Sequence, residues 1–186
     1  MSTSPVGHSP LLVVFSHGKE SGPHGRKIQA LAAVAQAEGA QTLSLNYREQ
    51  PSGVHHDHDT PGEADRRVDQ LLATPLPPHK RLILVGSSMG GYVSAVAASR
   101  MRVDGLFLLA PALSMPGYAQ VAPKVPVPHT TIVHGWRDDI IAWEHSARWA
   151  AEMRCALHLI DGDHRLDSAL PEIELRFRQF LKHFAT

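Results

Sequence analysis

Short apolar runs alternate with helical patterns along this chain, and the alternation restricts the fold more than any other feature. Residues 11–15 form a continuous apolar run, which is typical of a strand covered on both faces. Residues 26–38 follow with apolar side chains at helical spacing, and Gly39 ends that pattern. Six strands that alternate with helices predict an α/β fold, with a mostly parallel, doubly wound sheet and helices on both faces. Further strands are expected at 41–46, 82–86, 105–109, 130–134 and 156–160, and further helices at 62–73, 89–101, 143–153 and about 170–184.

The chain has 186 residues, a length that favours one domain over residues 1–186. Residues 1–9 precede the first expected strand, and we expect them to form a flexible N-terminal segment. The single cysteine, Cys155, excludes an intrachain disulfide. Nothing in the sequence indicates an oligomeric state.

Charge and hydropathy argue against several classes of partner. Lys and Arg together number 18, as do Asp and Glu, so the formal net charge is zero and no basic stripe favours nucleic acid. No apolar run approaches the ~20 residues that span a membrane. The N-terminus also lacks the charged and apolar regions of a signal peptide. We therefore expect a cytoplasmic protein that binds neither nucleic acid nor membrane.

The segment Gly86-Ser87-Ser88-Met89-Gly90 matches the G-x-S-x-G nucleophile elbow. It follows an expected strand and precedes an expected helix, which is the context that gives this motif its meaning. The two glycines let neighbouring backbone pass close to the turn. The turn lifts Ser88 out of the sheet at a helix N-terminus, where the helix dipole favours negative charge.

Other polar candidates also come directly after expected strands. In a doubly wound sheet, sites gather at the carboxyl ends of the strands. Residues 16–19 follow the first strand, Asp138 follows the fifth and His164 follows the sixth. Ser88, Asp138 and His164 thus occur in the chain order of an α/β-hydrolase triad.

The chain resembles the small, lid-less serine hydrolases of the α/β-hydrolase superfamily. The matching motifs are His17-Gly18, the elbow, His134-Gly135-Trp136-Arg137-Asp138 and Gly162-Asp163-His164-Arg165-Leu166, and the resemblance spans residues 11–184. It implies a minimal α/β-hydrolase fold that lacks the earlier strands of the full-size fold. It also implies that the backbone N–H groups of Lys19 and Met89 form the oxyanion hole.

The chemistry assigns a role to each member of the triad. Ser88 is a poor nucleophile until His164 takes its proton, and Asp138 would orient that imidazole and stabilise its charged form. Asp139 is the alternative acid, although the G-x-x-D spacing favours Asp138 and we expect Asp139 to cap a turn or face solvent. The alternative bases, His145, His158 and His183, fall within expected helices or a strand. His17 and His134 are interpreted as structural or supporting residues.

The segment His55-His56-Asp57-His58-Asp59 has the residue types of a metal site. The metallo-hydrolase pattern H-x-H-x-D-H would need Asp and His at positions 60 and 61, where the chain has Thr60 and Pro61. A solvated polar loop near the pocket rim is the better interpretation. Metal-dependent hydrolysis stays an alternative, and we expect no metal and no cofactor.

The connection at residues 111–128 is rich in proline and shows no pair of amphipathic helices. We therefore expect no cap domain and a shallow, open site. Met115, Tyr118 and Trp136 are the candidate apolar walls for substrate binding. Such a site suits a small-molecule short-chain ester or thioester.

Our functional hypothesis is a cofactor-free serine esterase that works through an acyl-enzyme. The triad does not distinguish among ester, thioester and amide substrates. The alternative is a hydrolase-fold binding or scaffold module with little physiological turnover.

Overall fold

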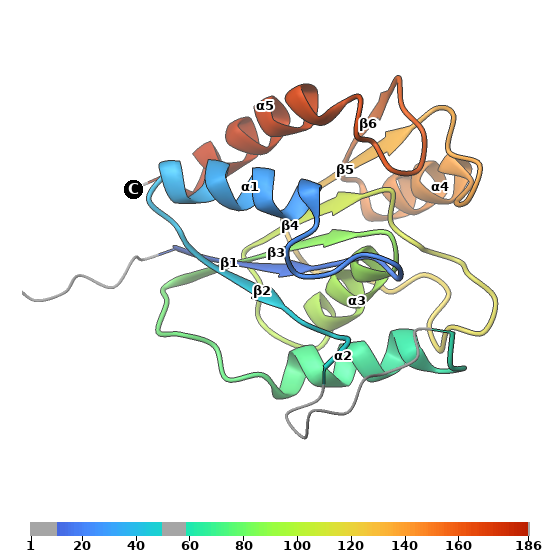
Figure 1. The fold of residues 1–186 in the computed structure, drawn as a ribbon, viewed down its shortest axis with the longest axis horizontal. Helices are drawn as coiled ribbons and strands as arrows, with labels where there is room; N and C mark the ends of the chain where they lie inside the picture. Colours follow the sequence, from blue (N-terminus) through green and yellow to red (C-terminus); the bar gives the residue numbers. More distant parts are fainter. Residues whose placement is uncertain (1–10, 50–58, 186) are drawn as a thin grey trace, which may run out of the picture.

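The computed structural model describes residues 11–49 and 59–185, and the expectation for residues 1–9 lies outside this part. Its centre is a sheet of six strands: β1 (Leu11–Ser16), β2 (Gln41–Leu45), β3 (Arg81–Ser87), β4 (Gly105–Leu109), β5 (His129–Gly135) and β6 (Ala156–Ile160). The strand order is β2-β1-β3-β4-β5-β6 (Figure 1). Every neighbouring pair is parallel, so the sheet is fully rather than mostly parallel.

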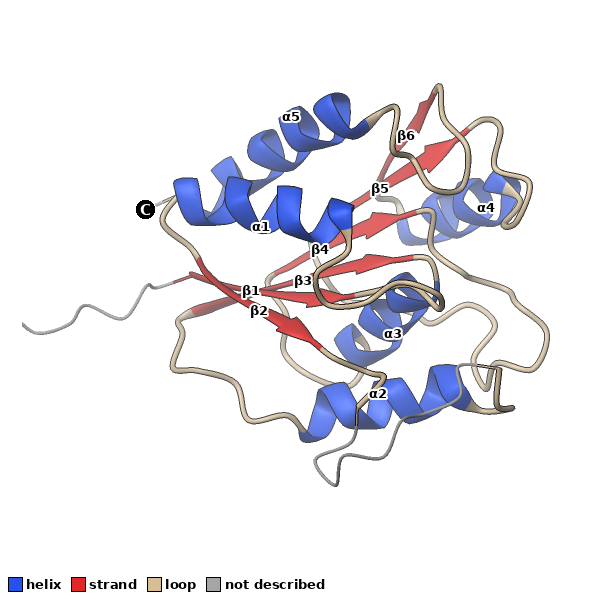
Figure 2. Cartoon of the chain, in the orientation of Figure 1, coloured by secondary structure: helices blue, strands red, loops and turns tan. Residues whose placement is uncertain are grey.

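Helices cover both faces of the sheet, as the alternating pattern predicted (Figure 2). One face carries α1 (Arg26–Ala37) and α5 (Leu170–Leu181), which pack side by side, and the other carries α2 (Glu63–Ala73), α3 (Met89–Ala98) and α4 (Trp143–Met153). A short 3₁₀ helix, η1 (Lys182–Phe184), follows α5. Gly39 lies just beyond the end of α1 with φ of 82°, a left-handed conformation that suits glycine and stops the helix.

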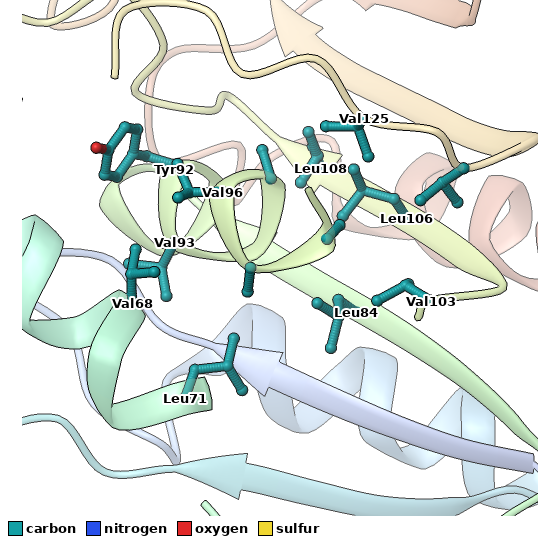
Figure 3. Close-up of a cluster of buried hydrophobic side chains, with 14 of the residues drawn as sticks. Val68, Leu71, Leu84, Tyr92, Val93, Val96, Val103, Leu106, Leu108 and Val125 are labelled. Carbon is teal, nitrogen blue, oxygen red and sulfur yellow. The ribbon is translucent and has the colours of Figure 1, made fainter. Parts of the chain in front are cut away.

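Two hydrophobic clusters hold these layers together, one on each face of the sheet. Successive side chains of a strand point to opposite faces, so Leu12 and Val14 of β1 join the cluster under α2 and α3, while Val13 and Phe15 join the other. Both faces of the central strands are buried, as their continuous apolar runs predicted. Figure 3 shows part of the first cluster, where Val68 and Leu71 of α2 and Tyr92, Val93 and Val96 of α3 meet Leu84, Leu106 and Leu108 of the sheet.

The strand order changes direction beside β1. β2 lies on one side of β1, and β3 to β6 follow on the other. In doubly wound sheets such a switch point opens a crevice at the carboxyl ends of the strands. Ser16 pairs with Gly86 in the register of β1 and β3, so the loops after these two strands leave the sheet next to each other. The topology alone therefore brings residues 17–19 beside Ser88.

No helix interrupts the connection between β4 and β5, which runs from residue 110 to 128. The expected absence of a cap domain is confirmed for this connection. None of the helices in residues 11–49 and 59–185 combines the length and apolar character that crossing a bilayer requires.

Candidate active site

Ser88 occupies a strained turn between β3 and α3. Its φ and ψ are 55° and −121°, a backbone conformation that residues other than glycine rarely adopt. The Ser88 N–H donates to the Leu109 carbonyl at 2.9 Å, and the Ser88 carbonyl accepts from the Ala112 N–H at 2.9 Å. These bonds to the end of β4 and to the segment just after it hold the turn, so that Ser88 stands at the N-terminus of α3.

The glycines of the elbow are required by close packing. A Cβ on Gly86 would lie 2.2 Å from the Gly90 carbonyl oxygen, and a Cβ on Gly90 would lie 2.0 Å from the Ser16 carbonyl oxygen. Both distances are far below van der Waals contact. Any larger residue at either position would push α3 away from the sheet and move Ser88.

Ser88, His164 and Asp138 form a continuous hydrogen-bonded chain. Ser88 Oγ is 3.0 Å from His164 Nε2, and His164 Nδ1 is 2.8 Å from Asp138 Oδ2. An ionised carboxylate only accepts hydrogen bonds, so Nδ1 carries the proton and Nε2 can accept from the Ser88 hydroxyl. The Asp138 side chain is fully buried, whereas His164 is 19% exposed and can meet a substrate.

Four hydrogen bonds converge on the Asp138 carboxylate. Oδ1 accepts from the N–H groups of Ile140 at 3.0 Å and Ile141 at 2.7 Å, and Oδ2 accepts from His134 Nε2 at 2.9 Å as well as from His164. Burial alone would raise the pKa of Asp138, but hydrogen bonds from Ile141 and His164 hold it below its usual value. The carboxylate is therefore charged and fixed in orientation.

His134 lies behind Asp138 and is fully buried. Its Nε2 faces two acceptors, Asp138 Oδ2 and the Ile141 carbonyl at 3.0 Å, while Nδ1 lies 2.7 Å from Ser146 Oγ. Burial lowers the pKa of His134 despite the neighbouring carboxylate. A neutral imidazole with its proton on Nε2 fits all three contacts.

The loop that carries His164 packs tightly on the loop that carries Asp138. A Cβ on Gly135 would lie 2.2 Å from the Gly162 carbonyl oxygen, which accepts from the Arg137 N–H at 3.0 Å. Lys27 of α1 supports the same loop, because its Nζ donates to the Arg165 carbonyl at 2.7 Å. Burial lowers the pKa of Lys27. Sequence reasoning missed Lys27, which belongs to no motif.

The two expected oxyanion donors flank Ser88. Gly18 packs against the serine, since a Cβ built on it would lie 3.4 Å from Ser88 Cβ, and Lys19 follows directly. Met89 is the first residue of α3, so its N–H is one of the helix donors without an intrahelical acceptor. Within residues 11–49 and 59–185, neither N–H donates to another group. The Lys19 side chain pairs with Asp59.

An open cleft of about 1080 Å³ surrounds Ser88 and His164, and Met115 and Tyr118 line it. The Tyr118 ring packs on Tyr92, with 4.5 Å between ring centroids. Asp65 of α2 accepts from the Tyr92 hydroxyl at 2.6 Å and from the Ala119 N–H at 3.1 Å. The connection that carries the two lining residues is thereby fastened to α2 and α3.

Trp136 lies outside this cleft, which corrects the expectation that it forms an apolar wall. Its N–H donates to the Ile160 carbonyl at 2.9 Å, and its ring packs against Trp143 with centroids 5.0 Å apart. The side chain is 52% exposed, and Trp136 is not among the residues that line the cleft. Ile140, four residues further along, lines the cleft instead.

The alternative acid and bases occupy other positions. Asp139 is exposed at the cleft rim, whereas the His164 contact is made by Asp138. His145 bonds the Leu113 carbonyl at 3.0 Å, His158 contacts Arg176 and His183 stacks on His129. Only His164 among the proposed bases reaches Ser88.

Of the metal-site candidate at residues 55–59, only Asp59 lies within the described residues. In the part of the chain that the structure describes, no three His, Cys, Asp or Glu side chains are grouped to hold a metal ion.

Sequence reasoning also missed a buried ion pair of α2, formed by Glu63 and Arg67. A signal was present, because Arg67 falls on the same helical face as Ala64, Val68 and Leu71, all of which are buried. A charged residue in an apolar stripe indicates a buried partner.

Comparisons with known proteins agree with this geometry. A family model that describes an alpha/beta hydrolase domain matches residues 9–179. The search of the curated proteins found no match. A Xanthomonas campestris structure described as belonging to the alpha/beta superfamily is 28% identical, with a TM-score of 0.75, and the match covers 94% of this chain and 99% of that one.

Two more distant structures share the fold. A Xanthomonas campestris serine hydrolase described as lacking a lid is 22% identical with a TM-score of 0.74, and the match covers 98% of this chain and 86% of that one. An esterase from Pyrococcus furiosus is 17% identical with a TM-score of 0.73, and the match covers 94% and 83%. At these identities the likeness concerns the fold alone.

Proposed function

We propose that this chain, which belongs to the alpha/beta hydrolase family, is a serine hydrolase that cleaves carboxylic esters through an acyl-enzyme. Ser88 is the nucleophile, His164 the general base and Asp138 the orienting acid. The observation that carries the proposal is the hydrogen-bonded chain from Ser88 Oγ through His164 to the buried Asp138 carboxylate.

The first half-reaction would acylate the enzyme. Ser88 Oγ attacks the carbonyl carbon of the ester while its proton passes to His164 Nε2. The carbonyl oxygen becomes an oxyanion, and the N–H groups of Lys19 and Met89 are the donors available to it. When the carbon–oxygen or carbon–sulfur bond of the substrate breaks, the proton on Nε2 goes to the leaving alcohol or thiol.

The second half-reaction would release the acid. Water attacks the acyl carbon, His164 takes one of its protons, and Ser88 leaves as the restored hydroxyl. The Asp138 carboxylate favours the imidazolium that forms in both halves because it accepts from Nδ1 throughout.

Substrate choice follows from the cleft. The connection between β4 and β5 adds no cap over it, and Met115, Tyr118 and Ile140 are among its apolar lining residues. These features favour a small-molecule ester or thioester with a short acyl chain. Amides would place a poorer leaving group on the same machinery.

Fluorophosphonate labelling followed by intact-mass measurement tests the proposal. Wild type should gain one adduct and Ser88→Ala none. Ser21→Ala removes another serine of the same cleft and serves as the matched control, which should still gain one adduct. Chelator-insensitive hydrolysis of a model ester would remove the metal-dependent alternative. A panel of esters, thioesters and amides of increasing acyl length then defines the substrate.

A folded wild type that gains no adduct would contradict the proposal. The chain would then be better described as a binding module on a hydrolase fold, and the next experiment would be a search for partners.

A further inference from the structure

A fully buried arginine lies beneath the loop that follows β1, and the proposed reaction gives it no role. Arg67 of α2 has 0% of its surface exposed, and its Nε donates to Glu63 Oε1 at 2.6 Å. Glu63 is 4% exposed and also accepts from Arg66. Burial would raise the pKa of Glu63, but hydrogen bonds from both arginines hold it below its usual value. A charged pair therefore lies inside the protein.

The far end of the Arg67 guanidinium faces the backbone of the β1 loop. Its Nη1 is 3.2 Å from the Gly18 carbonyl oxygen and 3.4 Å from that of His17. The His17 side chain holds the same Gly18 carbonyl. Its Nε2 accepts from the Tyr47 N–H at 3.2 Å, so Nδ1 carries the proton and donates to Gly18 at 2.7 Å. Two donors thus fix one carbonyl group.

That carbonyl belongs to the same peptide group as the Lys19 N–H. The described part of the chain has no cis peptide bond, and in a trans peptide the C=O and N–H point in opposite directions within one plane. Fixing the carbonyl toward the buried arginine therefore turns the Lys19 N–H the other way. Gly18, Lys19 and Ser88 all line the cleft, whereas Arg67 is not among its lining residues.

Stability alone is a poor reason for this arrangement. Replacing a buried ion pair by apolar residues is often neutral or stabilising, because desolvation offsets the attraction. Arg67 Nη2 is also buried and has no hydrogen-bond partner among the described residues. An arginine with an unsatisfied donor beside a candidate active site points to a functional constraint.

We propose that Arg67, held by Glu63, is a positioning residue that orients the Gly18–Lys19 peptide for the oxyanion hole. The inference rests on the proposed function, because it requires an oxyanion to form at Ser88. The positive charge next to the carbonyl also polarises the peptide, which makes the Lys19 N–H a stronger donor.

Steady-state kinetics of Arg67→Met and Arg67→Lys test this role, with active sites counted by complete fluorophosphonate labelling. Arg66→Met is the matched control, because Arg66 binds the same Glu63 but does not contact Gly18. Losing an oxyanion donor costs about 10²–10³ in kcat, so misorienting one should cost roughly 10- to 100-fold. KM should change little. Arg67→Lys keeps the positive charge but not the forked guanidinium group, so its kcat should lie between those of wild type and Arg67→Met.

A boronic acid gives a second readout, because its adduct with a serine is tetrahedral and anionic like the intermediate. The affinity of the boronic acid for Arg67→Met should fall in proportion to kcat/KM. If the role of Arg67 were purely structural, the variant would be less stable, but its boronic acid affinity and its kcat/KM per labelled site would be unchanged. The inference would be overturned, while the proposed function stands, if Arg67→Met kept the wild-type kcat per labelled site. The same holds if Arg66→Met lost as much kcat as Arg67→Met. If Arg67→Met does not fold, wild-type kcat in Arg67→Lys and in Glu63→Gln overturns it. An unlabelled, inactive wild type would defeat both proposals.

Discussion

Acidification should destabilise this protein through His17, a buried histidine outside the proposed triad. Its Nε2 accepts from the Tyr47 N–H, so a proton added there would set two donors against each other. Burial, aided by the nearby Arg67 cation, lowers the pKa of His17 from 6.5 to about 4. The folded protein therefore resists a protonation that the unfolded chain accepts readily.

The sign and size of the effect follow from linkage. Between pH 6.5 and about 4, the unfolded chain binds a proton at His17 that the folded chain does not. Stability therefore decreases as pH falls through this window, and His17 contributes no further loss below it. A pKa that decreases from 6.5 in the unfolded chain to about 4 in the folded protein, at about 1.4 kcal/mol per pKa unit, corresponds to about 3 kcal/mol in the free energy of unfolding. Domains of this kind are stable by only about 5–15 kcal/mol.

Urea unfolding at a series of pH values isolates this contribution. His17→Gln cannot titrate at this position, and every other histidine is common to both proteins. The free energy of unfolding of wild type, relative to the variant, should decrease by about 3 kcal/mol between pH ~7 and ~4. A difference that does not depend on pH would refute the reasoning. If the variant does not fold, NMR titration of the His17 ring in wild type decides, and a pKa near 6.5 would refute it.

Three further predictions concern the elbow, the acid and the cleft wall. Gly90→Ala places a Cβ 2.0 Å from the Ser16 carbonyl oxygen and should lower the free energy of unfolding in urea by more than about 4 kcal/mol. In the control Gly22→Ala the new Cβ meets nothing within 4 Å, so the loss should be under ~1 kcal/mol. Equal losses in the two variants would contradict the packing argument. Asp138→Asn should lower kcat by about 10⁴ because it disturbs the His164 tautomer, and a larger loss in Asp139→Asn would reverse the assignment. Asp65→Ala removes the acceptor of the Ala119 N–H and should raise KM roughly tenfold for esters that contact Tyr118, with kcat little changed. An unchanged KM would show that the hydrogen bond between Asp65 and Ala119 does not affect substrate binding.

The strands and helices were predictable because their signals are local. The elbow, the apolar run of β1 and the period of α5 each lie within a few consecutive residues, and buried parallel strands need little else to be recognised. The strand ends then gave the neighbourhood of Ser88, Asp138 and His164. The order of the strands in the sheet could not be predicted from any local segment, although the alternation of strands and helices made a parallel sheet the expected arrangement.

Side-chain direction was less predictable than backbone position. Trp136 comes directly after β5, yet its ring turns to Trp143 on α4, a contact between residues that no motif links. Arg67 and Gly18 are also far apart in the chain, and only the packing of α2 against the β1 loop brings them together. Such contacts depend on tertiary packing, which a single sequence does not specify by spacing.

Two buried, neutral histidines contact groups of the proposed site. His17 directs a donor at the Gly18 carbonyl and His134 directs one at the Asp138 carboxylate, and burial lowers the pKa of both. A buried lysine in either place would add a charge near the reacting atoms, whereas a neutral imidazole supplies a directed donor without one. The buried charges near Ser88 then act separately. In the proposed reaction, the Asp138 carboxylate would favour the imidazolium on His164, and the Arg67 guanidinium, partly balanced by Glu63, would favour the oxyanion. A positive charge on His134, which contacts Asp138, would weaken the first effect, so a buried and neutral His134 preserves the field that the proposed reaction needs.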